Sequence, residues 1–208
     1  RLYRYQVDDN IFRKTMRVPK GKSHGLILLL DRSGSMSGNM ASSIEQILVL
    51  SSFCRKVNIP FVVYGFGDSD DGRWADYPEI KQHGKSFTTE LGQLALSNVY
   101  LREYLNSKMS NLEYNTAMRN LVMLKQSYET RYFGRPVNES LSNTPLVQAL
   151  IALEPITNQF RKVNNLDLVN LVIVHDGDAD RVNSYIGESE LRDYEKDAGL
   201  TQPHRTVK

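Results

Sequence analysis

The sequence predicts an α/β protein whose open, mostly parallel, Rossmann-like sheet carries helices on both faces. Residues 26–31, 61–66 and 168–174 are continuous apolar runs rather than alternating ones, which is typical of strands covered on both faces. Between the first two runs, apolar residues recur at helical spacing over residues 44–57, so the order is strand, helix, strand. Such a unit joins parallel strands, and the three predicted strands therefore end at one edge of the sheet.

The composition is that of an ordinary globular domain, with 208 residues of which 24% are charged and 40% hydrophobic. No apolar run approaches the roughly 18 residues of a membrane-spanning helix, and no secretory leader follows Arg1. The single cysteine, Cys54, can form no internal disulfide, which fits a reducing compartment. We therefore expect a cytoplasmic protein with no membrane partner.

The chain is predicted to consist of a basic N-terminal arm, residues 1–24, and one domain, residues 25–208. The first 22 residues carry seven Lys and Arg and only two Asp. A basic arm can bind nucleic acid or an acidic partner. Here the charges alternate with apolar side chains such as Ile11 and Phe12, so we expect a packed, partly solvated arm and no nucleic-acid partner.

The stretch from about Leu91 to Thr130 is predicted to be a helical insertion, preceded by a short edge strand near residues 86–89. It contains no proline, one glycine and repeated apolar pairs, which favours two or three helices. It is also longer than a connection between strands requires. Its aromatic side chains could either select a partner or pack the insertion onto the sheet: Tyr100, Tyr104, Tyr114 and Tyr128.

Polar side chains gather where the predicted strands end, and this edge is where open α/β sheets bind ligands. One group lies in the segment Asp-Arg-Ser-Gly-Ser-Met, which follows the first strand. Another residue follows the third strand, and a threonine precedes a helix predicted over residues 145–158, where Pro145 suits the first turn. The five candidate residues are Asp31, Ser33, Ser35, Thr144 and Asp176.

Two carboxylates and three hydroxyls are hard oxygen donors, suited to Mg²⁺, Mn²⁺ or Ca²⁺ rather than to a soft metal. If the hydroxyls bind directly and the carboxylates act partly through water, the ion keeps much of its charge and an open position for an Asp or Glu of a partner. Gly34 and Gly38 are expected to allow the tight turn between the serines. A simpler interpretation makes these residues turn formers and helix caps, with Thr144 capping the helix that follows it.

The segments Asp-Arg-Ser-Gly-Ser-Met (31–36), Asn-Thr-Pro-Leu (143–146) and Val-His-Asp-Gly-Asp-Ala-Asp (174–180) resemble the metal-ion-dependent adhesion site of a von Willebrand factor A domain. The resemblance runs from about Gly25 to Asp180 and includes all five motif positions. It implies the fold of that family and a divalent cation, Mg²⁺ or alternatively Mn²⁺ or Ca²⁺, as its ligand.

Within that family, the flanking segments Ile44-Glu-Gln-Ile-Leu and Phe53-Cys-Arg-Lys-Val-Asn-Ile-Pro60 look most like cobaltochelatase-type subunits, including versions encoded by tailed bacteriophages. That likeness implies an AAA+ ATPase of the MoxR or chelatase type, or its client, as the protein partner. It also implies the host cytoplasm as the location of a phage-encoded chain. The family's sheet has further strands after the last motif, whereas residues 181–208 contain no strong apolar run, so the C-terminal edge is expected to be truncated or minimal.

Two classes of function are consistent with these residues, a cation-dependent binding module and a metal-dependent hydrolase of phosphate esters. A hydrolase needs a nucleophile or a general base beyond the metal ligands. Arg32 stands between two of the candidate ligands, and no lysine motif or second acidic pair follows. His175 is interpreted as a strand-end residue and residues 68–71 as a solvated acidic turn. The sequence therefore favours the binding module, without catalytic residues; a scaffold with an empty site is a third interpretation.

Overall fold

The computed structural model describes residues 23–68, 94–95, 99–130, 134, 136, 139–177, 179–180, 183–185 and 204–206. Residues 1–22 of the predicted arm and the edge strand predicted near residues 86–89 lie outside this part of the chain. None of the helices in the described part is long and apolar enough to cross a membrane.

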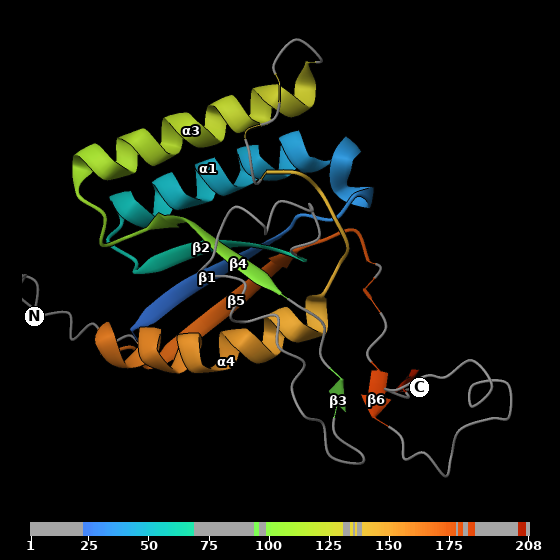
Figure 1. Cartoon of the computed structure of the whole chain (residues 1–208). Helices are drawn as coiled ribbons and strands as arrows, with labels where there is room; N and C mark the ends of the chain where they lie inside the picture. The colour runs from blue at the N-terminus through green and yellow to red at the C-terminus, as the bar shows by residue number, and fades with distance from the viewer. Residues whose placement is uncertain are drawn as a thin grey trace, which may run out of the picture.

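The main sheet has four strands in the order β4-β2-β1-β5. Strand β1 (His24–Asp31) lies parallel to both β2 (Phe61–Gly67) and β5 (Leu168–Val174), and β4 (Tyr100–Asn106) pairs antiparallel with β2. The three predicted strands and their parallel arrangement are confirmed. All three end at the same edge of the sheet, near the start of the short helix η2 (Ser35–Gly38) (Figure 1).

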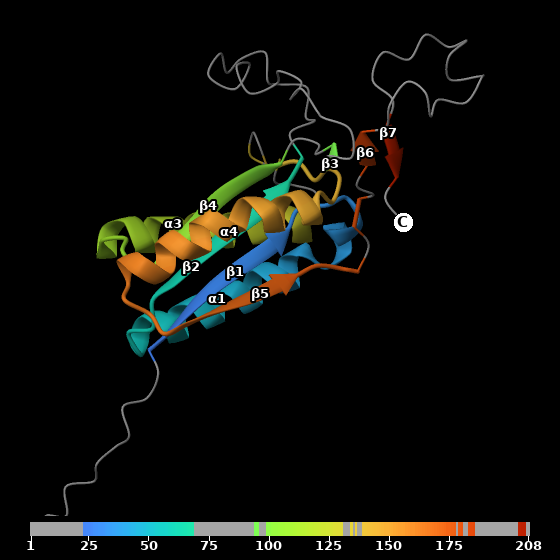
Figure 2. The ribbon, with the colours of Figure 1, turned by 90° about the horizontal axis from the view of Figure 1, so that it is seen from below.

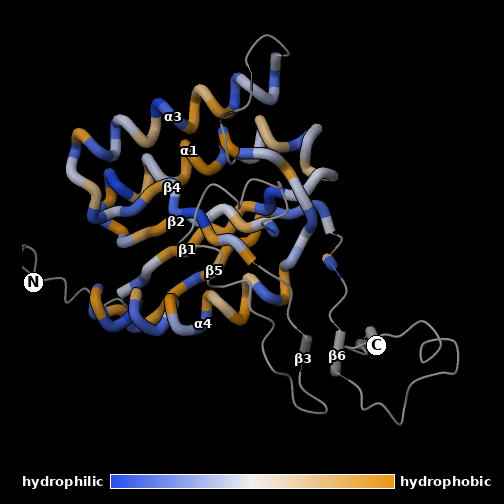
Figure 3. Tube along the Cα trace, in the orientation of Figure 1, coloured by the Kyte–Doolittle hydropathy of each residue, from blue (hydrophilic) through white to orange (hydrophobic). Residues whose placement is uncertain are grey.

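Helices cover both faces of this sheet, which confirms the predicted α/β fold (Figure 2). Helices α1 (Met40–Lys56) and α3 (Asn111–Glu129) pack side by side on one face, and α4 (Leu146–Val163) covers the other. Alternate residues of β1 enter two separate apolar clusters, with Leu28 and Leu30 facing α1 and Ile27 and Leu29 facing α4. Both faces of β1 are therefore buried, which explains its continuous apolar sequence (Figure 3).

Strand β4 corrects the prediction that residues 91–130 form a helical insertion. Residues 100–106 are an edge strand of the main sheet, and only the part from Asn111 to Glu129 is helical. The register of β4 against β2 shifts beside Tyr104, so Leu101 and Leu105 pack into clusters on opposite faces of the sheet. This irregularity breaks the alternation of apolar residues expected of a strand, because the neighbouring Tyr104 and Leu105 both contact the same cluster.

The tyrosines of this stretch pack against the rest of the domain instead of projecting into solvent. Tyr114 is buried in the core, where its ring meets Phe61 edge-on with the centroids 6.4 Å apart. The other three are half-buried: Tyr100 lies beside the Arg32 guanidinium, the Tyr104 hydroxyl donates to the Glu139 carboxylate, and the Tyr128 hydroxyl donates to the Glu139 carbonyl. Of the two interpretations of these aromatic residues, the structure supports packing, and selection of a partner stays a prediction: Tyr100, Tyr104, Tyr114 and Tyr128.

Strand β5 lies at the edge of the sheet, whereas its apolar sequence predicts a strand in the interior. In the described part of the chain it pairs with β1 alone, and Leu168, Leu171 and Val172 are 39–44% exposed. Beyond Asp180, strands β6 (Asn183–Tyr185) and β7 (His204–Thr206) form a separate antiparallel sheet with β3 (Leu94–Ala95).

Candidate metal centre

The turn after β1 brings three of the five candidate residues into contact. The Asp31 side chain is completely buried, and its Oδ1 accepts a hydrogen bond of 2.8 Å from the backbone N–H of Ser33. The Ser33 and Ser35 hydroxyl oxygens lie 3.0 Å apart. Gly34 has φ −61° and ψ −35°, an ordinary right-handed conformation, so the expectation that this glycine is needed for the turn is wrong. The Asp31 carboxylate stabilises the turn through its hydrogen bond from Ser33.

The second carboxylate oxygen of Asp31, Oδ2, is buried and has no hydrogen-bond partner within the described residues. Burial raises the pKa of Asp31 above its ordinary value, and the hydrogen bonds from Ser33 oppose this rise. A buried acceptor without a donor is destabilising, whereas a bound cation would satisfy it. This oxygen therefore has the environment expected of a metal ligand in the absence of its metal.

Thr144 reaches the same edge of the sheet through the segment that precedes α4. Ser142 forms a parallel bridge with Ser33, in which the N–H of Gly34 donates to the Ser142 carbonyl at 2.8 Å. The N–H of Ser142 in turn donates to the carbonyl of Arg32 at 3.0 Å. The two segments that carry Ser33 and Thr144 are thus joined by backbone hydrogen bonds.

The alternative role of Thr144 as a helix cap finds no support in the geometry of α4. Pro145 occupies the N-cap position, and α4 has no side-chain cap hydrogen bond there. Thr144 is 7% exposed, and its carbonyl accepts hydrogen bonds from the N–H groups of Leu146 (2.7 Å) and Asp180 (2.9 Å). The backbone of Thr144 is therefore fixed on both sides while its hydroxyl does not cap the helix.

Asp176 follows β5 and is exposed, close enough for its negative charge to raise the pKa of Asp31 further. Gly177 has φ +109°, a conformation that favours glycine, and its N–H donates to His175 Nδ1 at 3.0 Å. This turn fixes His175 as a strand-end residue beside the site. Within the described residues, no hydrogen bond joins Asp176 or Thr144 to the other three candidates.

Three polar residues beside the centre are not among the five predicted ligands: Asp68, Asn143 and Asp180. The Asp68 carboxylate accepts hydrogen bonds from the backbone N–H and the side-chain amide of Asn143, the former at 3.1 Å. The pKa of Asp180 is raised by burial and by the charge of Asp68. Asp68 is therefore attached to the segment before α4, and residues 69–71 of the predicted acidic turn lie outside the described part. Its place directly after the parallel strand β2 was the available signal.

A metal ion bound by the five candidate residues would need hydroxyl groups among its ligands. In the described part of the chain, no group of three or more His, Cys, Asp or Glu side chains could hold a metal ion. The five candidates contain only two such side chains, so binding would require the three hydroxyls as well. Oxygen donors of this kind suit a hard cation and exclude a site of the soft-metal type.

Comparison of the chain with protein-family models, curated proteins and solved structures finds no match. The case for a metal centre therefore depends on the chain's own residues.

Proposed function

We propose that this chain is a divalent-cation-dependent protein-binding module of the von Willebrand factor A type. The observation that carries the proposal is the buried Asp31 carboxylate, one oxygen of which holds the turn while the other has no hydrogen-bond partner in the described residues. Mg²⁺ is the proposed ion, with Mn²⁺ or Ca²⁺ as substitutes. The residues proposed to hold it are Asp31, Ser33, Ser35, Thr144 and Asp176.

The charges of these groups favour recognition of an acidic partner. Three of the five donors are neutral hydroxyls, and one of the two carboxylates, Asp176, is exposed. A divalent cation held by such a set keeps part of its positive charge and attracts an Asp or Glu side chain of a partner. The exposed position of Ser35 and Asp176 leaves room for that side chain at the edge of the sheet.

The direction of Arg32 favours binding over hydrolysis of a phosphate ester. Its guanidinium Nη2 lies 3.5 Å from Glu139 Oε2 and 3.4 Å from the Ser140 carbonyl, and the residue is 6% exposed. A cationic side chain that stabilises a phosphoryl group must face the reacting atoms. The Arg32 guanidinium instead contacts Glu139 and Ser140, so it is not directed at a group bound to the proposed ligands.

The partner we propose is a ring-forming AAA+ ATPase or its client, on the strength of the resemblance to cobaltochelatase-type subunits, and the proposed location is the cytoplasm. The test is capture from a host lysate on immobilised protein, in Mg²⁺ and in EDTA, with mass spectrometry of the retained proteins. We expect an AAA+ ATPase or its client to be retained in Mg²⁺ and lost in EDTA, and lost with Asp31→Ala and Ser33→Ala. Ser37→Ala changes an exposed serine of the same turn and is the matched control. Equal capture by the Asp31→Ala variant would refute the proposal.

A further inference from the structure

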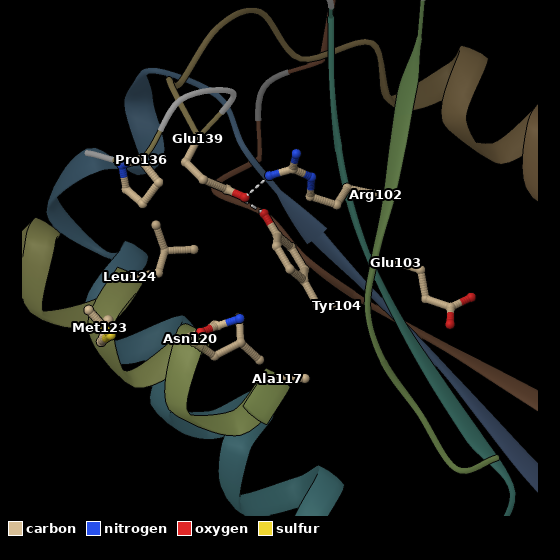
Figure 4. A pocket seen from close by; sticks show the side chains of 10 residues that line it. Arg102, Glu103, Tyr104, Ala117, Asn120, Met123, Leu124, Pro136 and Glu139 are labelled. Atoms are coloured by element: carbon tan, nitrogen blue, oxygen red, sulfur yellow. Dashed lines mark hydrogen bonds and ion pairs between the residues drawn. The ribbon is translucent and has the colours of Figure 1, made fainter. Parts of the chain in front are cut away.

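A buried ionic network connects the turn after β1 with β4 and with the segment before α4. Its centre is Glu139, a carboxylate that is 6% exposed. Glu139 accepts hydrogen bonds from Arg102 and from the Tyr104 hydroxyl, the latter at 2.7 Å (Figure 4). The Glu139 carbonyl accepts a further hydrogen bond from the Tyr128 hydroxyl at 3.1 Å. Arg32 completes the network through its ion pair with the same carboxylate.

The sheet is shaped to admit the Arg32 side chain. A Cβ atom on Gly65 of β2 would lie 2.9 Å from Arg32 Cδ and 2.5 Å from Tyr104 Cε2, so the space beside this glycine is filled by those two side chains. Glycine inside a strand weakens it and marks a close approach of another group. The Arg32 side chain therefore passes close to the backbone of β2 at Gly65 on its way to Glu139.

Arg32 is also part of the candidate metal centre's backbone. It lies between Asp31 and Ser33, and its carbonyl accepts the hydrogen bond from Ser142, two residues before Thr144. The side chain of Arg32 thus binds Glu139 and Ser140 while its main chain holds Ser142. Arg32 is therefore attached to the segment 139–144 at Glu139, Ser140 and Ser142.

We propose that Glu139 is a positioning residue for the metal centre: through Arg32 it holds the turn of Asp31 and Ser33 in register with the segment that carries Thr144. This inference rests on the proposed function. Without the carboxylate, two buried or half-buried guanidinium groups would repel one another, and relief would come from movement of Arg32 and its neighbours. Outer residues that orient ligands in this way typically change metal affinity about 10- to 100-fold when mutated.

The experiment measures the dissociation constant of Mn²⁺ by isothermal titration calorimetry, together with the melting temperature of each metal-free variant. We expect Glu139→Gln to raise the constant about 10- to 100-fold. The matched control is Glu103→Gln, a carboxylate on the same strand as Arg102 that is exposed and directed away from Glu139 (Figure 4), and it should leave the constant unchanged. Tyr104→Phe removes one hydrogen bond to Glu139 and keeps all charges, so it should raise the constant about two- to tenfold even if Glu139→Gln does not fold.

The outcomes separate a positioning role from a purely structural one. A lower melting temperature with an unchanged Mn²⁺ constant in both Glu139→Gln and Tyr104→Phe would overturn the inference and leave the proposed function intact. Two results would overturn the proposed function and this inference together. One is that the wild-type protein binds no Mn²⁺, and the other is that Asp31→Ala binds Mn²⁺ as tightly as wild type.

Discussion

Replacing Asp31 by Asn should have opposite effects on stability with and without metal. In the metal-free protein, Asn keeps the oxygen that accepts the Ser33 N–H and removes the buried charge of Oδ2. It also removes the repulsion between Asp31 and Asp176. The amide nitrogen of Asn would take the place of Oδ2 as a buried polar group without a partner in the described residues, so that cost of about 1–3 kcal/mol remains in both proteins. The variant gains only from the loss of the buried charge, and it should therefore be more stable than wild type in EDTA.

Added Mg²⁺ should raise the free energy of unfolding of wild type more than that of the variant. A ligand at 100 times its dissociation constant raises the free energy of unfolding by about 2.7 kcal/mol. Asp31→Asn removes a charged ligand, so the variant gains much less. The stability difference between the two proteins should therefore shift by up to about 2.7 kcal/mol in favour of wild type, which cancels or reverses the order seen in EDTA.

Urea unfolding followed by circular dichroism, in EDTA and in Mg²⁺, measures both effects. The EDTA series should also depend on pH. Because the folded-state pKa of Asp31 is raised, its protonated form favours folding, and that stability is lost as pH rises above the ordinary pKa through the raised one. The advantage of Asp31→Asn should thus be absent in acid and grow toward neutral pH. A variant that is less stable than wild type by the same amount in EDTA and in Mg²⁺ would refute the reasoning.

Three further predictions address other parts of the structure. Gly65→Ala should lower the free energy of unfolding by about 1–3 kcal/mol, measured by urea unfolding, because its Cβ would overlap Arg32 and Tyr104; unchanged stability would contradict the packing described. Thr144→Val should weaken Mn²⁺ binding in calorimetry while leaving the melting temperature nearly unchanged, since the threonine does not cap α4; a large fall in melting temperature would point to a structural hydroxyl. The Cys54 thiol, 2% exposed and with its pKa raised by burial, should react with a thiol reagent only in denaturant, as followed by absorbance.

Much of the fold could be predicted because buried parallel strands have a distinctive sequence. β1 and β2 are continuous apolar runs, since each is covered by helices on both faces. The same signal misplaced β5 in the interior, because an apolar run does not reveal how many neighbours a strand has. The antiparallel strand β4 was missed because its irregular register beside Tyr104 breaks the alternation of apolar residues expected of a strand.

The candidate site could be predicted only where its contacts are local in sequence. Asp31, Ser33 and Ser35 lie within five residues, and a strand followed by a helix fixes their common edge. Glu139 contacts Arg32 and Arg102 across three separate segments of the chain, and no spacing rule relates them. The sequence does contain one sign of the contacts around Glu139. Gly65 is a glycine inside an apolar strand, and the Arg32 and Tyr104 side chains fill the space beside it.

The most direct test of the central claim is an anomalous difference map from crystals of the full chain soaked in Mn²⁺. We predict one strong peak at the carboxyl edge of the main sheet, about 2–2.5 Å from oxygen atoms of Ser33, Ser35 and Thr144 and in contact with Asp31 directly or through water. A peak beside Asp68 and Asp180 instead, or no peak at this edge, would contradict the proposed metal centre.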